Sequence, residues 1–270
     1  MMRDITLGQY YSHSSVIHRL DPRVKLLGTL VYILTLFLQK HIFGFAAAVL
    51  VFCVCVLLSK VPFSYMVRGL RPVLVILVFS SILHLFFTPG TVLFEIGSVH
   101  ITKEGGILAG KTVLRITLLI LGSSLLTLTT TPTTLMDGME KSLKPLQVFK
   151  IPVHEVAMMM SIALRFIPVL LEETDKIMKV QAARGMDFTS GKIWERVKKL
   201  VPILVPLFAS SIRRAEELAL AMESRCYHGG NGRTKLHPLK YQKRDYLGYL
   251  CVFIYFCCAV WLSKISVSIG

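Results

Sequence analysis

The sequence has 270 residues, of which 53% are hydrophobic and only 17% are charged, and its mean hydropathy is +0.61. These values are typical of a protein with several membrane spans and exclude an ordinary soluble domain. The net charge of +15 would suit nucleic-acid binding, but the basic residues are sorted along the chain and form no patch with interleaved aromatic residues, so no nucleic-acid partner is expected.

The N-terminal segment is polar and leads into a helix start. The first fifteen residues lack an apolar stretch, so no cleavable signal peptide is expected. Residues 18–26 read HRLDPRVKL. Asp21 is placed to cap a helix whose first residue is Pro22. Arg23 and Lys25 are expected to hold this end of the helix at anionic lipid headgroups.

Five apolar runs are candidate transmembrane helices. A span needs roughly 17 to 25 residues, and the first run is short, but lysines flank it and can extend toward the membrane surfaces. The second run follows after a three-residue turn, which predicts a helical hairpin. The predicted spans are residues 26–38, 42–58, 72–87, 107–131 and 246–262.

The basic residues predict the orientation of these spans. The N-terminal segment carries four lysines and arginines, the 59–71 loop three, and residues 132–245 nineteen of the total of 31. All three segments lie on one side of the predicted topology. The positive-inside rule therefore places the N-terminus and residues 132–245 in the cytoplasm of a multi-pass protein of the cell membrane.

This topology divides the chain into three regions. Residues 1–131 hold the N-terminal segment and the first four spans, residues 132–245 form a cytoplasmic block, and residues 246–270 hold the last span and a C-terminal tail. The predicted fold is an all-α integral membrane protein with about five transmembrane helices and a cytoplasmic domain of amphipathic helices.

Two long runs within the cytoplasmic block share one layout. Each begins apolar and contains proline, continues with a Glu-Glu pair, and ends on an arginine between small residues, the two arginines being 41 positions apart. The repeat predicts one structural device used twice. Its tips are Ala183, Arg184 and Gly185 in the first run and Ser224, Arg225 and Cys226 in the second, with Pro168, Glu172 and Glu216 among the residues before them.

Two interpretations of the tips are open. A glycine just past a helix end and a cation near it are features of an ordinary helix C-terminus. The repetition favours docking tips instead, because an arginine presents five donors in a rigid fork that suits a groove lined by carbonyls or carboxylates. Small flanking residues would let each arginine enter such a groove.

Helical spacing predicts the faces of the second run. Ile212, Ala215, Ala219, Met222 and Cys226 form one stripe, while Arg213 and Arg214 are expected on the solvent side. In the first run, Arg165 stands within an apolar stretch. It precedes Glu172 and Glu173 by seven and eight residues, so we expect an internal ion pair.

No motif indicates catalysis or cofactor binding. Residues 105–112 match the P-loop pattern G-x-x-x-x-G-K-[ST], but the run that follows has no acidic residue and is predicted to be a membrane helix, so we interpret the match as chance. The eight histidines and six cysteines have no metal-ligand spacing. We therefore expect no metal site, no bound cofactor and no catalytic residue in this chain.

Three stretches of the chain resemble the T component of energy-coupling factor (ECF) transporters, the EcfT/CbiQ family. They are HRLDPRVKL at 18–26, PVHEVAMMMSIALRFIPVLLEE with the tip at 183–185, and RRAEELALAMESRCY at 213–227. Transporters of this family are ABC-type importers of vitamins and transition-metal ions. The second tip departs from the Ala-Arg-Gly-like triplets common in the family but keeps small flanks.

The resemblance implies a non-catalytic coupling subunit. Residues 132–245 would be the coupling domain, with Arg184 docking on one ATPase subunit and Arg225 on another; ATP and Mg²⁺ would be held by those partners. The spans and apolar helix faces would hold a small membrane-embedded S component that binds the substrate. Asp21, Pro22, Arg165, Pro168, Glu172 and Glu216 would have structural or coupling roles.

Two alternatives remain at this point. A conventional ABC permease subunit would need a polar translocation path through its own helices and one main coupling loop. A membrane-embedded enzyme would need carboxylates, histidines or a nucleophile gathered at one depth. Both are disfavoured by the composition of the predicted spans.

Overall fold

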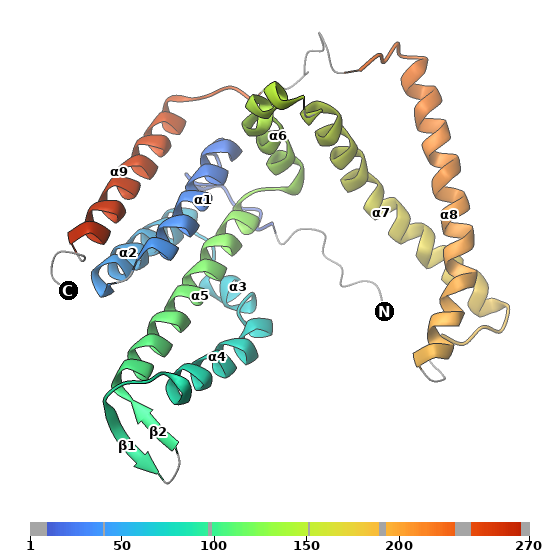
Figure 1. Ribbon diagram of the computed structural model, residues 1–270. Helices are drawn as coiled ribbons and strands as arrows, with labels where there is room; N and C mark the ends of the chain where they lie inside the picture. Colours follow the sequence, from blue (N-terminus) through green and yellow to red (C-terminus); the bar gives the residue numbers. More distant parts are fainter. Residues whose placement is uncertain are drawn as a thin grey trace. The chain divides into compact units, whose positions relative to one another are not determined.

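A computed structural model describes residues 10–39, 41–96, 99–150, 152–188, 193–229 and 239–265. Its ribbon consists almost entirely of helices (Figure 1). The chain separates into two compact units. The membrane unit comprises Leu7–Met139 and Leu239–Gly270, and the second unit comprises Glu140–Pro238.

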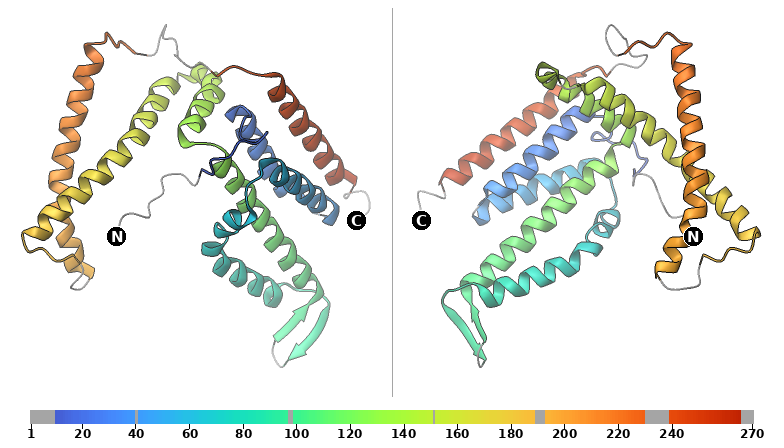
Figure 2. Two further views of the ribbon diagram at one scale, coloured as in Figure 1. Left: turned by 180° about the vertical axis from the view of Figure 1, so that it is seen from behind. Right: turned by 45° about the vertical axis from the view of Figure 1, so that its right-hand side comes forward.

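Four long helices form the centre of the membrane unit. They are α1 (Pro22–Leu38), α2 (Ile42–Ser59), α5 (Lys103–Thr129) and α9 (Lys243–Ile265). Both α1 and α2 pack against α5 and α9, and the bundle is visible in two views (Figure 2). The chain's last helix therefore returns to the helix that begins the fold.

The core of the bundle is apolar. Its largest fully buried side chains include Phe45, Leu36, Met66 and Leu128. Gly122 lets the ring of Tyr32 approach α5 closely, because a Cβ at that glycine would lie 2.7 Å from a ring carbon. Most other apolar side chains of these helices are exposed, as expected for helices whose outer faces meet lipid.

The segment between α2 and α5 adds a helix and a short β-hairpin. It contains α3 (Phe63–Arg68), the 3₁₀ turn η1 (Arg71–Val73) and α4 (Leu74–Phe87), which packs on α5. Strands β1 (Val92–Ile96) and β2 (Val99–Thr102) then pair antiparallel. The hairpin was not predicted from the sequence.

Thr102 fixes the start of α5. Its hydroxyl donates to the Thr88 carbonyl at 2.8 Å and accepts from the Gly105 N–H at 3.2 Å. The P-loop match therefore lies on the first turns of a helix, so its backbone N–H groups do not form a phosphate-binding loop. A short strand precedes it, but that strand belongs only to the hairpin.

The prediction of an all-α membrane protein with about five spans is confirmed, apart from the small hairpin. Within the described ranges, five helices are long and apolar enough to cross a membrane: Ile42–Ser59, Phe63–Phe87, Lys103–Thr129, Val153–Ala183 and Lys243–Lys264. Four of these match predicted spans. The predicted first span is the 17-residue α1, whereas Val153–Ala183 was predicted to belong to the cytoplasmic block.

The second unit is built mainly from two helices of 31 residues each. After α6 (Pro132–Leu143) and η2 (Lys144–Phe149), the chain forms α7 (Val153–Ala183) and α8 (Ile193–Glu223). Prolines lie inside both helices, yet each continues through them. His154 near the start of α7 lies 3.0 Å from the Glu140 carboxylate.

Candidate functional site: a pair of arginine-tipped helices

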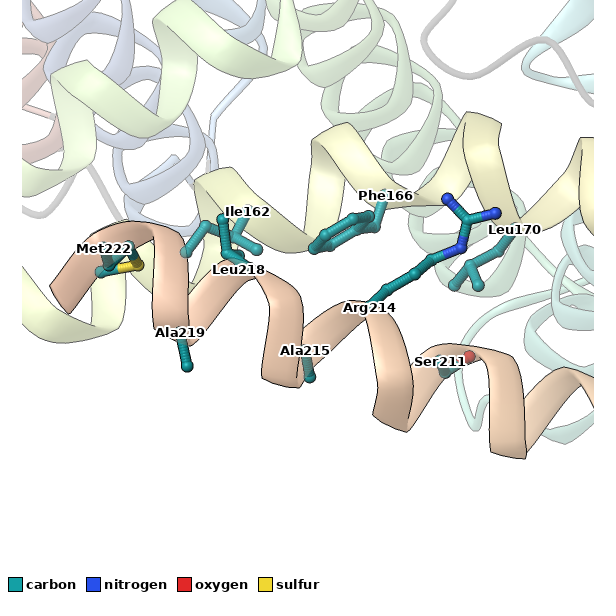
Figure 3. A pocket seen from close by; sticks show the side chains of 9 residues that line it. All are labelled: Ile162, Phe166, Leu170, Ser211, Arg214, Ala215, Leu218, Ala219 and Met222. Carbon is teal, nitrogen blue, oxygen red and sulfur yellow. The ribbon is translucent and has the colours of Figure 1, made fainter. Parts of the chain in front are cut away.

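Helices α7 and α8 pack against each other along a groove of about 330 Å³. Figure 3 shows Phe166 and Ile162 of α7 facing Leu218 of α8. The predicted stripe is confirmed in part, since Ala215, Ala219 and Met222 line this groove. The remaining lining residues are Leu170, Ser211 and Arg214.

Arg214 corrects one sequence prediction. Its Nη2 atom donates to Oε2 of Glu173 at 3.1 Å, so this arginine faces α7 and does not lie on the solvent side. Arg213 is exposed, as predicted. The adjacent arginines differ because the contact face of α8 follows Ser211, Arg214 and Leu218, about one residue away from the predicted stripe.

A hydrogen bond at a proline also ties the two helices together. Pro206 has no backbone N–H, so the carbonyl of Pro202, four residues earlier, loses its helical donor. The side-chain Nε2 of Gln181 on α7 donates to this carbonyl at 3.3 Å. The proline that interrupts the ladder of α8 thereby creates an acceptor for α7.

The end of α7 is a Schellman motif centred on the first tip. The Met186 N–H donates to the Gln181 carbonyl at 3.1 Å, and the Gly185 N–H donates to the Ala182 carbonyl at 3.0 Å. Gly185 has a φ of 87°, the left-handed conformation that glycine tolerates best. Arg184 is the C-cap residue immediately before it.

The end of α8 has the same hydrogen-bond pattern. The Tyr227 N–H donates to the Met222 carbonyl at 3.1 Å, and the Cys226 N–H donates to the Glu223 carbonyl at 2.9 Å. Cys226 has a φ of 57°, so it takes the left-handed position that Gly185 takes in the first tip. Arg225 again precedes the left-handed residue.

Both interpretations of the tips are therefore compatible with the geometry. Backbone hydrogen bonds form an ordinary helix C-terminus in each case, and the arginine side chain takes no part in them. Arg184 and Arg225 are exposed, and neither guanidinium has a hydrogen-bond or ion-pair partner within the described ranges. The flanking Ala183 and Ser224 are also exposed, so no described residue of the same unit covers the two cations.

The two tips lie at opposite ends of the helix pair. Contacts between α7 and α8 pair Gln181 with Pro202 and Glu173 with Arg214, so residue numbers rise on one helix as they fall on the other. The helices are antiparallel, which is also visible in Figure 1. About 25 residues of helix separate the tips, or roughly 37 Å at a rise of 1.5 Å per residue.

The other predicted residues of the second unit lie on its surface. Pro168, Glu172 and Glu216 are exposed. Arg165 is exposed too, and it forms no ion pair among the described residues, so the expected pairing with the Glu-Glu pair is not observed. Seven residues correspond to about 10.5 Å along a helix, too far for a direct contact. Glu173 pairs with Arg214 instead.

In the membrane unit, Asp21 caps α1 as predicted. Its carboxylate accepts from the Arg23 N–H at 2.9 Å, and Pro22 is the first helical residue. The prediction that Arg23 and Lys25 reach lipid headgroups is wrong, because both side chains donate to backbone carbonyls of the protein. Asp245, which the sequence analysis missed, lies buried beside Asp21.

Asp245 carried a recognisable signal. It lies at the third position of α9 and its Oδ2 accepts from the Gln242 N–H at 2.7 Å, which is the acidic half of a capping box. Among the described residues, no group of three or more histidine, cysteine, aspartate or glutamate side chains could hold a metal ion.

The fold and site define a helical membrane protein that carries an antiparallel pair of arginine-tipped helices. The profile of a family described as cobalt transport protein, CbiQ, matches residues 13–236. The chain belongs to this EcfT/CbiQ family.

Three relatives, each named energy-coupling factor transporter transmembrane protein EcfT, show how far the similarity extends. The Clostridium kluyveri protein is 49% identical over 267 residues, covering 98% of both chains. The Bacillus subtilis protein is 50% identical over 247 residues, covering 91% of this chain and 93% of the relative. The Lactococcus lactis protein is 46% identical over 266 residues, covering 98% of this chain and 100% of the relative.

Proposed function

We propose that this chain is the transmembrane coupling subunit of an ECF-type importer. The observation that supports it best is the pair of exposed arginines on helix ends with the same hydrogen-bond pattern, at opposite ends of one antiparallel helix pair. Two equivalent tips suit two equivalent partners. The relatives named EcfT support the same assignment.

Each tip would dock in a groove of one ATPase subunit. An arginine offers a planar fork of five donors, and the small residues beside it leave the fork accessible. Arg184 would engage one subunit and Arg225 the other. ATP and Mg²⁺ would be bound and ATP hydrolysed in those subunits, while this chain contributes no catalytic residue.

A second surface would hold the membrane-embedded S component. An apolar stripe runs along α8, and its members recur at intervals of three or four residues with about half or more of their surface exposed. Such a stripe indicates a protein or lipid partner. Its members are Trp194, Val197, Val201, Val205 and Phe208.

Closure of the ATPase pair would shift the two tips and tilt α7 and α8, and the S component on their apolar surface would change orientation across the membrane. The imported substrate would be a vitamin or a transition-metal ion bound by that component. The N-terminus and the second unit would face the cytoplasm, where the ATPases reside.

Affinity purification of the tagged chain from its native membrane tests the proposal. We expect two ATPases with Walker motifs, together with one or more small hydrophobic proteins, by mass spectrometry. Recovery of the chain alone, or with a single soluble binding protein, would contradict the coupling role. A permease or a membrane-embedded enzyme would then have to be tested by transport and activity assays on the purified chain.

A further inference from the structure

The first turn of α1 contacts both segments through which the chain leaves and re-enters the membrane unit. The chain leaves through the end of α5 and the start of α6, and returns through residues 239–245 before α9. Four residues of this turn each contact a different part of these two segments: Asp21, Pro22, Arg23 and Lys25.

Lys25 contacts the end of α5, where the chain leaves the bundle. Its Nζ donates to the Thr129 carbonyl at 2.9 Å and lies 3.3 Å from Oγ1 of Thr130. A third bond at 3.2 Å joins the same Nζ to the His18 carbonyl. The terminal carbonyls of a helix lack intrahelical donors and carry partial negative charge, so an ammonium group here satisfies and stabilises the end of α5.

Pro22 contacts the next element along the chain, helix α6. A Cβ added to Gly138 of α6 would lie 2.9 Å from Cβ of Pro22 and 3.3 Å from its carbonyl carbon. Real Cβ atoms essentially never lie within 3.0 Å of another atom, so a larger residue at position 138 would push α6 away from the first turn of α1.

Arg23 and Asp21 contact the segment through which the chain re-enters the membrane unit, residues 239–245. The Arg23 guanidinium donates to the Leu239 carbonyl at 3.4 Å and stacks over the Tyr241 ring with 4.5 Å to the centroid. The Asp21 N–H donates to Oδ1 of Asp245 at 2.9 Å. Asp245 is only 2% exposed, and its carboxylate joins the helix starts of α1 and α9 because it also accepts from the Gln242 N–H.

We propose that this turn is the mechanical anchor of the coupling subunit. The anchor consists of residues 21–25 of this turn together with Asp245 of α9 and Gly138 of α6. The chain runs from the bundle into the second unit after Met139 and re-enters the bundle at Leu239, and a flexible connection at either place would absorb movement of the second unit. Polar contacts that are buried or partly buried resist bending, because breaking one leaves a polar group without its partner. The anchor would make both connections rigid, so that motion of α7 and α8 moves α1, α5 and α9.

This inference rests on the proposed function and makes a separate prediction. Loss of the anchor should leave docking on the ATPases and ATP hydrolysis intact while interrupting transmission to the bundle. A residue with only a structural role would instead lower stability in every nucleotide state and leave the ATP-induced movement unchanged.

The test uses hydrogen exchange of the assembled complex, purified through the tagged chain and studied in nanodiscs with and without ATP. The variants are Lys25→Met, Asp245→Asn and Gly138→Ala. Arg19→Met is the matched control, because Arg19 lies in the same segment but is exposed and has no side-chain partner among the described residues. ATP hydrolysis is measured on the same samples.

In wild type and Arg19→Met, ATP should change the exchange of residues 10–39 and 239–265. In the three anchor variants this change should fall by about tenfold while hydrolysis persists. An ATP-induced change of wild-type size in the variants, or none in wild type, would overturn the anchor. Loss of assembly in all three variants would do so as well. If no ATPases co-purify with the tagged wild-type chain, the proposed function itself fails.

Discussion

Glu173 of α7 and Arg214 of α8 form an ion pair at 3.1 Å, and the two residues occupy equivalent places in the repeat. Glu173 precedes the Arg184 tip by eleven positions, and Arg214 precedes the Arg225 tip by the same number. The repeated device therefore carries opposite charges at matching positions. In an antiparallel pair these positions face each other, so the charge difference helps to fix the register of the two helices.

Removing this ion pair should loosen the helix pair by a modest amount. The two side chains are 36% and 25% exposed, so solvent screens their attraction. We expect a coupling free energy of about 0.5 to 1 kcal/mol in a double-mutant cycle of Glu173→Gln and Arg214→Met, measured by unfolding in detergent. Arg213→Met serves as the control, and its cycle with Glu173→Gln should give no coupling. Equal coupling for both arginines would show that Arg214 has no specific partner.

Truncating either tip should weaken binding of the ATPases. If each arginine anchors one interface, Arg184→Ala and Arg225→Ala should each cost about 2 kcal/mol, a loss of affinity of about 30-fold. The double variant should lose both ATPases. The yield of ATPase recovered with the tagged chain is the measurement, and Arg213→Ala on the exposed face of α8 is the control.

A double variant that retains full ATPase recovery would show that the tips are only helix ends. Unequal losses in the two single variants would remain consistent with docking, because the residues after the arginines differ. The contradiction therefore requires both arginines to be dispensable together.

The membrane spans and the two tips were predictable because their signals are local. A run of apolar residues long enough to cross a bilayer identifies a span wherever it packs. Gly185 after Arg184 likewise marks a helix end without knowledge of the fold. The hairpin also had a local signal, since Gly97-Ser98 separates two short β-rich runs in the sequence, although it was not recognised.

The contacts that join distant segments were not predictable. Asp21 and Asp245 are 224 positions apart, and no spacing rule connects them. Adjacent arginines in α8 differ in environment only because of how α7 crosses, which the hydrophobic pattern does not determine to within one residue. Lys25 was expected at lipid headgroups because the end of α5, which it contacts, could not be placed from sequence.

Exchanging the left-handed residues of the two tips should have opposite effects on stability. Gly185→Ala places a Cβ at a φ of 87°, which should destabilise the chain by about 1 kcal/mol although the added Cβ would meet no atom within 4 Å beyond the neighbouring backbone. Cys226→Gly removes that strain and should stabilise it by about 0.5 to 1 kcal/mol, after the greater flexibility of glycine in the unfolded chain is included. Thermal unfolding in detergent measures both changes. The same sign for the two variants would contradict an equivalent geometry of the tips.

His18 makes the N-terminal segment sensitive to acid. Its Nε2 lies 3.1 Å from the Tyr11 carbonyl, which can only accept, so Nε2 carries the hydrogen. Its Nδ1 lies 2.7 Å from the Ser15 hydroxyl, which donates to it. Burial, with a smaller contribution from the nearby Lys25 cation, lowers the pKa of His18 below its ordinary value of 6.5.

The sign of the pH effect follows from this lowered pKa. Below about pH 6.5 the unfolded chain binds a proton at His18 before the folded chain does, so the free energy of unfolding falls as the pH falls through the folded pKa. We expect wild type to lose more thermal stability between about pH 7 and pH 5 than His18→Gln, which cannot titrate. His41→Gln is the control, because His41 is exposed and makes no capping hydrogen bond at the start of α2. An identical loss in wild type and His18→Gln would place the acid sensitivity elsewhere, whereas a loss reduced only in His18→Gln ties it to the segment that Tyr11 and Lys25 fasten to the end of α5.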